Sequence, residues 1–132
     1  MFSTDRVYLD PDLGPEKGLR RYKNWLTTEF HRGGVVYEFG TNDQIKGFAL
    51  LSIENELCHY ILGGVYEEFQ NTGEGVLTAV NPFYYFMKYN IKVKKVYGGL
   101  SSNNFPMEQI YNFLNYKVDS LTYVLVKHQR IE

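Results

Sequence analysis

The stretch Gln70-Asn71-Thr72-Gly73-Glu74-Gly75 lies where two different sequence patterns meet. The apolar segment 57–66 before it is typical of a strand, and the amphipathic segment 76–87 after it has the spacing of a helix. Glycine allows the main chain to approach a ligand closely, and the first turn of a helix has free N–H groups and the positive end of the helix dipole. The stretch therefore predicts a loop whose amides could hold a pyrophosphate. The alternative is a plain strand-to-helix turn.

The composition indicates one ordinary globular domain. The chain has 132 residues, enough for a single core, and its 14 basic and 15 acidic residues give no overall field that would favour nucleic acid. The single cysteine, Cys58, cannot form a disulfide within the chain, which fits a reducing compartment. The N-terminal sequence lacks a secretory apolar region, and no apolar run is long enough to span a membrane. These observations predict a cytoplasmic protein without nucleic-acid or membrane partners.

Before the glycine-containing loop, the sequence predicts one helix and a three-stranded meander. The predicted elements are an extended segment at 6–9, a helix that begins near Pro15 and stops at Gly33-Gly34, and strands at 35–40, 45–54 and 57–66. Proline suits the first turn of a helix, and short turns rich in Asn, Asp and Glu separate the strands. The three strands should therefore pair antiparallel.

After the loop, helices and strands should alternate. The predicted elements are a helix at 76–87, a strand at 93–100, a helix at 105–115 with Asn104 as its N-cap, and a closing strand at 116–127 whose alternation includes Val124 and Val126. Pro82 should kink or break the first helix between Thr78 and Pro82. The residues of the second helix that should face inward are Ile110, Phe113 and Leu114. The fold class is α/β, a mixed and mostly antiparallel central sheet flanked by helices.

Two motifs in this order resemble those of the GNAT superfamily of acyl-CoA-dependent N-acyltransferases. The first motif is an apolar strand that ends in Val-x-Pro-Glu, followed by Arg or Gln, then x-x-Gly-x, then Gly or Ala. The matching run here is Val65-Tyr66-Glu67-Glu68-Phe69-Gln70-Asn71-Thr72-Gly73-Glu74-Gly75. Glu67 stands where proline is common. The second is an Asn before a helix that carries Tyr and ends in Leu-Gly-Phe; the matching residues are Asn104, Tyr111 and Leu114-Asn115-Tyr116. The resemblance spans residues 35–127.

The N-terminal part of the fold is expected to be abbreviated. GNAT proteins usually begin with a strand and two helices, whereas this sequence has room for one short strand and one helix. Residues 1–132 are then a shortened single domain, the C-terminal part of a longer chain, or part of a sheet that a partner such as a second copy in a homodimer completes. Residues 6–11, with Tyr22 and Trp25, also resemble the start of the catalytic half of nucleotide-sugar amine acetyltransferases.

For the cofactor, the resemblance implies acetyl-CoA (coenzyme A) as co-substrate and no metal. The backbone N–H groups that would bind its pyrophosphate belong to Asn71, Thr72, Gly73, Glu74 and Gly75, and the side chains that would add hydrogen bonds are Gln70 and Thr72. The Glu74 carboxylate should then point away from the phosphates. Asn104 would bind the pantetheine arm or cap its helix.

The resemblance also implies a bulge at 62–66 in the strand before the loop. The bulge would expose the Val65 N–H, which would stabilise the oxyanion of a tetrahedral intermediate. The alternative for Gly63-Gly64 is that it makes room for a bulky neighbour.

Tyr111 is the predicted catalytic side chain. Attack of an amine on acetyl-CoA expels a thiolate, and a phenol with a pKa of about 10 can protonate or hydrogen-bond a sulfur whose thiol has a pKa of about 8.5. The alternative is a core tyrosine, one of 12 in the chain. The candidate general bases are Glu54, Glu56, His59, Glu67 and Glu68, and a water chain would also serve. The histidines, which show no metal-ligand spacing, are His31, His59 and His128.

The resemblance implies an N-acetyltransferase that moves the acetyl group from acetyl-CoA directly to a primary amine. The acceptor would be a nucleotide-linked amino sugar or a small amine, bound between the first helix and the strands around 45–54. Two other classes stay open. A non-catalytic acyl-CoA-binding or sensory module would bind CoA without releasing thiol, and an interaction domain with a chance motif would not be stabilised by acetyl-CoA.

Overall fold

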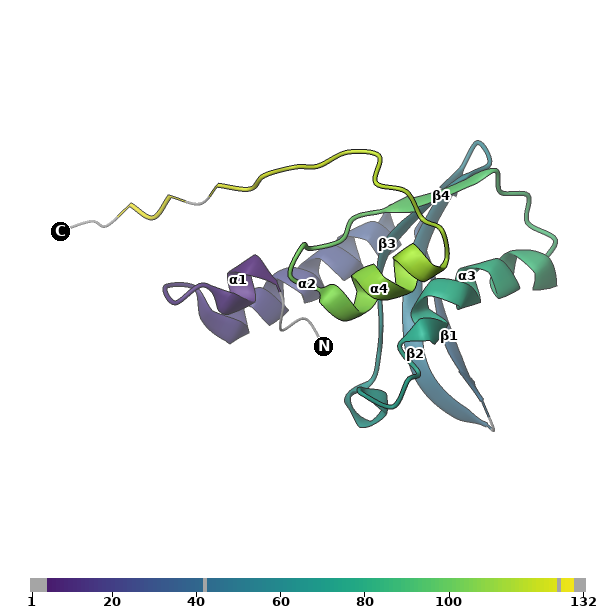
Figure 1. The fold of residues 1–132 in the computed structure, drawn as a ribbon, viewed down its shortest axis with the longest axis horizontal. Coiled ribbons are helices and arrows are strands. Elements are labelled where there is room, and N and C mark those ends of the chain that lie inside the picture. Colours follow the sequence, from purple (N-terminus) through teal and green to yellow (C-terminus); the bar gives the residue numbers. More distant parts are fainter. Residues whose placement is uncertain (1–4, 42, 126, 130–132) are drawn as a thin grey trace.

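The computed structural model describes residues 5–41, 43–125 and 127–129. Its elements are α1 (Arg6–Leu9), α2 (Gly14–His31), β1 (Val35–Thr41), β2 (Gln44–Glu54), β3 (Leu57–Val65), a 3₁₀ turn at Glu67–Phe69, α3 (Val76–Lys88), β4 (Lys95–Gly98) and α4 (Phe105–Phe113). β1, β2 and β3 pair antiparallel, and β4 joins β3 in parallel, which gives the sheet order β1-β2-β3-β4 (Figure 1). The predicted mixed α/β fold and its antiparallel meander are confirmed.

Helices cover both faces of this sheet. The cluster on one face consists of Leu50, Ile61 and Leu62 with the α2 side chains Tyr22, Trp25 and Leu26. The cluster on the other face is centred on Leu51, Cys58 and the α3 side chain Phe86. Neighbouring strand residues point to opposite faces, so Leu50 and Leu51 each enter a different cluster. Both leucines are fully buried, and burying a leucine stabilises the fold by about 1.5–3 kcal/mol.

Among the described residues, 5–41, 43–125 and 127–129, no helix is both long enough and apolar enough to cross a bilayer.

Cys58 is expected to be unreactive in the folded protein. Its side chain is fully buried, and burial raises the pKa of the thiol to about 11. Because the thiolate is the reactive form, the raised pKa and the lack of access both slow modification near neutral pH. We expect the thiol to react with DTNB only after denaturation. Rapid reaction of the native protein would contradict this placement of Cys58.

The N-terminal segment is a short helix, so the predicted extended segment at 6–9 is wrong. The Asp5 carboxylate caps α1, since it accepts hydrogen bonds from the amides of Val7 at 2.9 Å and Tyr8 at 3.2 Å. The same carboxylate forms an ion pair with Arg21 of α2 and accepts a hydrogen bond from the Tyr22 hydroxyl at 3.1 Å. Two helices, and no strand among the described residues, therefore precede β1.

α3 runs from Val76 to Lys88 without a break, so the predicted break between Thr78 and Pro82 is wrong, while the kink predicted as its alternative stays a prediction. Proline removes one hydrogen bond from the helix, and that loss is local. Pro82 is fully buried, and the preceding Asn81 side chain donates to the Leu77 carbonyl at 2.9 Å. Packing against the sheet therefore keeps the helix continuous across the proline.

α4 is shorter than predicted and less buried. It ends at Phe113, whose side chain is 84% exposed instead of facing inward. Ile110 and Leu114 are half-buried, as expected for the inward side. The helix thus offers only part of its apolar surface to the rest of the protein.

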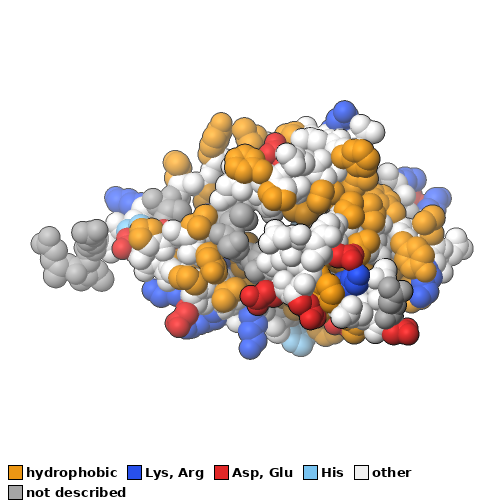
Figure 2. Space-filling view, turned by 60° about the horizontal axis from the view of Figure 1, so that its bottom comes forward, with side chains coloured by type: hydrophobic (Ala, Val, Ile, Leu, Met, Phe, Trp, Pro, Cys, Tyr) orange, Lys and Arg blue, Asp and Glu red, His pale blue; other side chains and the backbone are white. Residues whose placement is uncertain are grey.

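The predicted closing strand at 116–127 does not form in the described residues. Residues 116–125 have no regular structure, and Val126 lies outside the described residues. The segment leaves the sheet and runs toward the α1 end of the molecule (yellow in Figure 1). Its apolar side chains are exposed, up to 93% for Leu125. Hydrophobic side chains also gather on the face drawn in Figure 2.

Candidate functional site

β3 and β4 form a fork in the sheet. They pair in parallel only from Leu57 with Lys95 to Tyr60 with Gly98. β4 was predicted over 93–100 but ends at Gly98, whereas β3 continues to Val65. No described strand pairs with this edge of β3 beyond Tyr60. The main chain is therefore open on that side.

The main chain of β3 directs amides into this fork. The Tyr66 N–H donates to the Lys46 carbonyl of β2 at 2.9 Å, and Val65 is paired with Gly47. In an antiparallel ladder, residues that lie between hydrogen-bonded pairs turn their N–H groups away from the partner strand. The Val65 N–H therefore faces the fork, and so does the N–H of Gly63, two residues earlier. Val65 is the residue for which the resemblance implied an oxyanion donor.

The irregularity of β3 lies at Ile61, so the prediction of a bulge within 62–66 is wrong. Leu50 of β2 pairs with Leu62, whereas Leu51 pairs with Tyr60, which leaves Ile61 as an extra residue on β3. The extra residue directly follows the last residue of β3 that pairs with β4. The bulge therefore lies at the base of the fork.

Gly63 makes room for a tyrosine ring, which was the alternative explanation for the glycine pair. A Cβ on Gly63 would lie 1.9 Å from the Tyr60 hydroxyl oxygen. Gly63 and Gly64 keep regular pairs with Ala49 and Phe48 of β2. Tyr60 was not among the predicted site residues; the available signal was an aromatic residue three positions before a glycine in a strand.

We expect Gly63→Ala to lower the free energy of unfolding by about 1–3 kcal/mol. The added methyl group would collide with the Tyr60 ring and would lie 3.0 Å from the Phe48 carbonyl oxygen. Urea denaturation measures the change. Gly75→Ala is the control, because a Cβ there meets nothing within 4 Å and φ is −56°. Equal stability of Gly63→Ala and the wild type would show that the Tyr60 ring lies elsewhere.

The loop before α3 presents a run of free amides. Among the described residues, none accepts a hydrogen bond from the backbone N–H groups of 71–75. The amides of Leu77 and Thr78, by contrast, donate within the first turn, to the carbonyls of Glu74 and Gly75. A Cβ on Gly73 would meet nothing within 4 Å. These residues fit a pyrophosphate, because the amides are unused and no described protein atom fills the space beside Gly73.

The side chains of the loop have defined partners. The Thr72 hydroxyl donates to the Phe69 carbonyl at 2.6 Å, so its proton is used within the loop. The Glu74 carboxylate forms an ion pair with Lys46 of β2, which compensates its charge. Gln70 makes no side-chain hydrogen bond to any described residue. The main chain is therefore the principal donor surface of this loop.

α4 begins beside the start of α3 and carries two of the predicted site residues. The Thr78 hydroxyl of α3 lies 3.7 Å from the Met107 sulfur of α4. Asn104 occupies the N-cap position, but its side chain makes no capping hydrogen bond, so the capping alternative is wrong for this side chain. The Tyr111 ring packs at 4.9 Å from the Tyr116 ring.

The pKa of Tyr111 distinguishes the two roles that the sequence left open for its phenol: protonating the departing sulfur, or donating a hydrogen bond to it. Burial raises its pKa to about 12, and the neighbouring Tyr116 adds to the effect. A thiol has a pKa of about 8.5, so transfer of the phenol proton to a thiolate would be unfavourable. Hydrogen-bond donation carries no such cost. The environment of Tyr111 therefore favours hydrogen-bond donation over proton transfer.

Two of the candidate general bases, Glu56 and His59, make different kinds of contact. Glu56 forms ion pairs with Lys92, at 3.0 Å, and with Lys94. The His59 ring stacks on Tyr97 with ring centroids 4.8 Å apart. These two rings border a shallow hollow near the β2–β3 turn. Glu56 is thus held by lysines, whereas His59 lies on an accessible face of the sheet.

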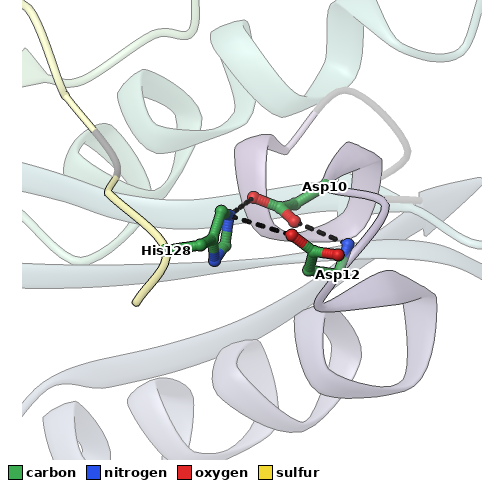
Figure 3. A group of neighbouring side chains, drawn as sticks. All are labelled: Asp10, Asp12 and His128. Atoms are coloured by element: carbon green, nitrogen blue, oxygen red, sulfur yellow. Dashed lines mark hydrogen bonds and ion pairs between the residues drawn. The ribbon is translucent and has the colours of Figure 1, made fainter. Parts of the chain in front are cut away.

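A further group of side chains joins the two ends of the chain (Figure 3). His128 Nε2 lies 2.8 Å from Asp10 Oδ2 and 3.9 Å from Asp12 Oδ2. Desolvation acts to raise the pKa of Asp10, but the Asp12 amide, the His128 ring and the Leu13 amide outweigh it and hold the pKa below its ordinary value. This contact was not predicted, because His128 is remote in the sequence from Asp10 and Asp12. These bonds tie the C-terminal segment to α1.

Comparisons with known proteins find likeness only in structure. No family model matches the sequence, and no curated protein matches it. One solved structure with a similar fold is a putative acetyltransferase from Bacillus subtilis, 17% identical with a TM-score of 0.62, over 89% of this chain and 78% of that one. An IAA acetyltransferase from Bacillus cereus is 16% identical with a TM-score of 0.61, over 74% of this chain and 64% of that one. Aminoglycoside N-acetyltransferase AAC(6')-Iy, in complex with CoA, is 13% identical with a TM-score of 0.53, over 86% of this chain and 96% of that one.

Proposed function

Because the chain has the fold of the GNAT acyltransferases, we propose that it is an N-acetyltransferase with acetyl-CoA as co-substrate and a primary amine as acceptor. The observation that carries the proposal is the combination of an open fork, which the Val65 N–H faces, with the unused amides of 71–75. Such a loop suits a pyrophosphate, because consecutive N–H groups bind the anion without needing charged side chains.

In the proposed reaction, the amine nitrogen attacks the thioester carbonyl carbon and forms the C–N bond. The carbonyl oxygen gains negative charge, which the Val65 N–H stabilises. The electron pair on oxygen then re-forms the C=O bond, the C–S bond breaks with its electron pair going to sulfur, and CoA leaves as a thiolate. The extra proton on nitrogen passes to water or to a base. Holding the two substrates together supplies much of the rate, so no acyl-enzyme is required.

The proposed role of Tyr111 is to donate a hydrogen bond to the departing sulfur. Its buried phenol stays protonated over the whole neutral range, because its pKa is raised to about 12. The Asn104 side chain, which is not used as a helix cap, is proposed to bind the pantetheine arm. The loop amides, the Asn104 side chain and the Val65 N–H would then hold CoA from its phosphates to its thioester.

The pH profile should show no loss of rate from Tyr111 between about pH 8 and pH 10. The donor is the protonated phenol, which is complete below its pKa of about 12 and is lost only as the pH rises through that value. The measurement is kcat against pH for the wild type and Tyr111→Phe. A fall near pH 10 that occurs in the wild type and not in Tyr111→Phe would contradict the assignment.

For the acceptor, we propose a nucleotide-linked amino sugar or a small amine, bound on the α2 side of β2 and β3. One solved protein with this fold is an aminoglycoside N-acetyltransferase, which favours an amine carried on a sugar. The rings of Tyr22 and Trp25 lie on that side of the sheet and are only partly buried. Aromatic surfaces of this kind pack well against the apolar faces of sugars and bases.

The test is a thermal-shift titration with acetyl-CoA, followed by a thiol-release assay across a panel of amines. The proposal predicts stabilisation by acetyl-CoA and release of CoA thiol with at least one amine. Stabilisation without thiol release for any amine would indicate a non-catalytic acyl-CoA-binding module. Absence of stabilisation would contradict the proposal entirely.

A further inference from the structure

The Tyr60 hydroxyl is buried and has no hydrogen-bond partner among the described residues. A buried hydroxyl without a partner destabilises the folded state, because it has lost its hydrogen bonds to water. A phenylalanine would fill the same space without this cost. The hydroxyl is therefore a candidate for a role that the folded protein alone does not reveal.

The main chain of Tyr60 lies at the base of the fork, and its side chain covers the neighbouring face of β3. Tyr60 is the last residue of β3 that pairs with β4, opposite Gly98. Its hydroxyl oxygen lies across Gly63, 1.9 Å from where a Cβ would stand. The N–H groups of Gly63 and Val65 face the same fork. The hydroxyl thus lies beside the stretch of main chain that would meet the thioester.

The electrostatic surroundings keep the Tyr60 hydroxyl protonated. Its pKa is raised, first by burial and then by the nearby phenols of Tyr111, Tyr37 and Tyr116. At neutral pH the group can therefore only be a neutral hydrogen-bond donor or acceptor. Its closeness to Tyr111 brings two phenols from different elements, β3 and α4, to one side of the fork.

We propose that the Tyr60 hydroxyl donates a hydrogen bond to the carbonyl oxygen of the acyl thioester, beside the Val65 N–H. This inference rests on the proposed acetyl transfer. As the amine nitrogen bonds to the carbonyl carbon, the π electrons move to the oxygen, and the hydroxyl stabilises that charge without giving up its proton. When the C–S bond breaks, the electrons return and the sulfur leaves with its pair. The thiol group of free CoA offers no such oxygen.

The direct test is the carbonyl resonance of acetyl-CoA labelled with carbon-13 at the carbonyl. A hydrogen bond to a carbonyl oxygen moves this resonance downfield, so we expect a downfield shift on binding to the wild type. Tyr60→Phe should bind acetyl-CoA but lose most of that shift, and it should lower kcat about tenfold. Because the lost hydroxyl had no partner, Tyr60→Phe should unfold at or above the wild-type temperature.

Tyr37→Phe is the matched control. Its hydroxyl is likewise buried without a partner among the described residues, and it lies on β1, where its ring stacks on Tyr85 at 5.0 Å. This variant should keep the wild-type carbonyl shift and rate. The assignment of Tyr60 is overturned if Tyr60→Phe keeps the full shift, if it unfolds well below the wild type, or if Tyr37→Phe loses the shift equally. If the wild type binds no acetyl-CoA, the proposed function itself fails.

Discussion

Gly73→Val is expected to abolish binding of acetyl-CoA, with a loss in affinity of about a hundredfold or more, or about 2.8 kcal/mol. Gly73 has φ of +85°, and a Cβ there would point into open space beside the amides of 71–75. A branched side chain would occupy the volume proposed for the pyrophosphate. It would also strain the backbone by about 1–3 kcal/mol and turn neighbouring amides away from the ligand. The measurement is isothermal titration with acetyl-CoA.

Two variants separate the loss of binding from the loss of stability. Gly33→Val imposes the same kind of strain, since Gly33 has φ of +94° and open space around it, but it lies between α2 and β1. It should lower the unfolding temperature and leave affinity unchanged. Gly75→Ala adds a methyl group to the loop without a positive φ, so it should weaken binding with little effect on stability. Wild-type affinity in Gly73→Val would refute the proposed phosphate site.

Tyr111→Phe is expected to lower kcat about a hundredfold while changing the affinity for CoA less than twofold. The phenol is proposed to stabilise the departing sulfur, and that interaction is strongest when the C–S bond has broken. Removing it should therefore affect the transition state more than the bound ground state. Single-turnover thiol release measures the chemical step, and titration with CoA measures the binding.

Tyr116→Phe is the control for Tyr111→Phe. The two rings pack together at 4.9 Å, so the change keeps the packing around Tyr111 and removes a neighbouring hydroxyl. We expect Tyr116→Phe to keep kcat within about twofold of the wild type. Equal turnover in Tyr111→Phe and the wild type would remove the catalytic assignment of Tyr111.

The regular elements of the fold follow well from local sequence, and the exceptions have a common physical cause. The meander was predictable because the strands alternate and are separated by turn residues. α1 was not, because its cap, Asp5, is fixed by contacts with Arg21 and Tyr22 of α2. The segment 116–127 alternates like a strand, but a strand also needs a neighbour to pair with, and the described part of the segment has none.

The candidate site also contains features that local sequence predicted and features that it did not. The loop 70–75 could be recognised from its glycines and from its place between a strand and a helix. The fork could not, because the sequence does not fix where β4 ends, at Gly98, or where the extra residue of β3 lies, at Ile61. The unpaired hydroxyl of Tyr60 was still harder to predict, since its position depends on both the bulge and the space above Gly63.

The amides of the loop before α3 are the central part of the proposed site, and amide chemical shifts report on them one by one. In a nitrogen-15 spectrum of the labelled protein, adding acetyl-CoA should move the amide resonances of 71–75 and of Val65, with a saturating dependence on concentration. Free CoA should move the loop resonances as well, because it carries the same pyrophosphate. If acetyl-CoA leaves the loop resonances in place, or moves only resonances remote from the fork, the proposed site is wrong.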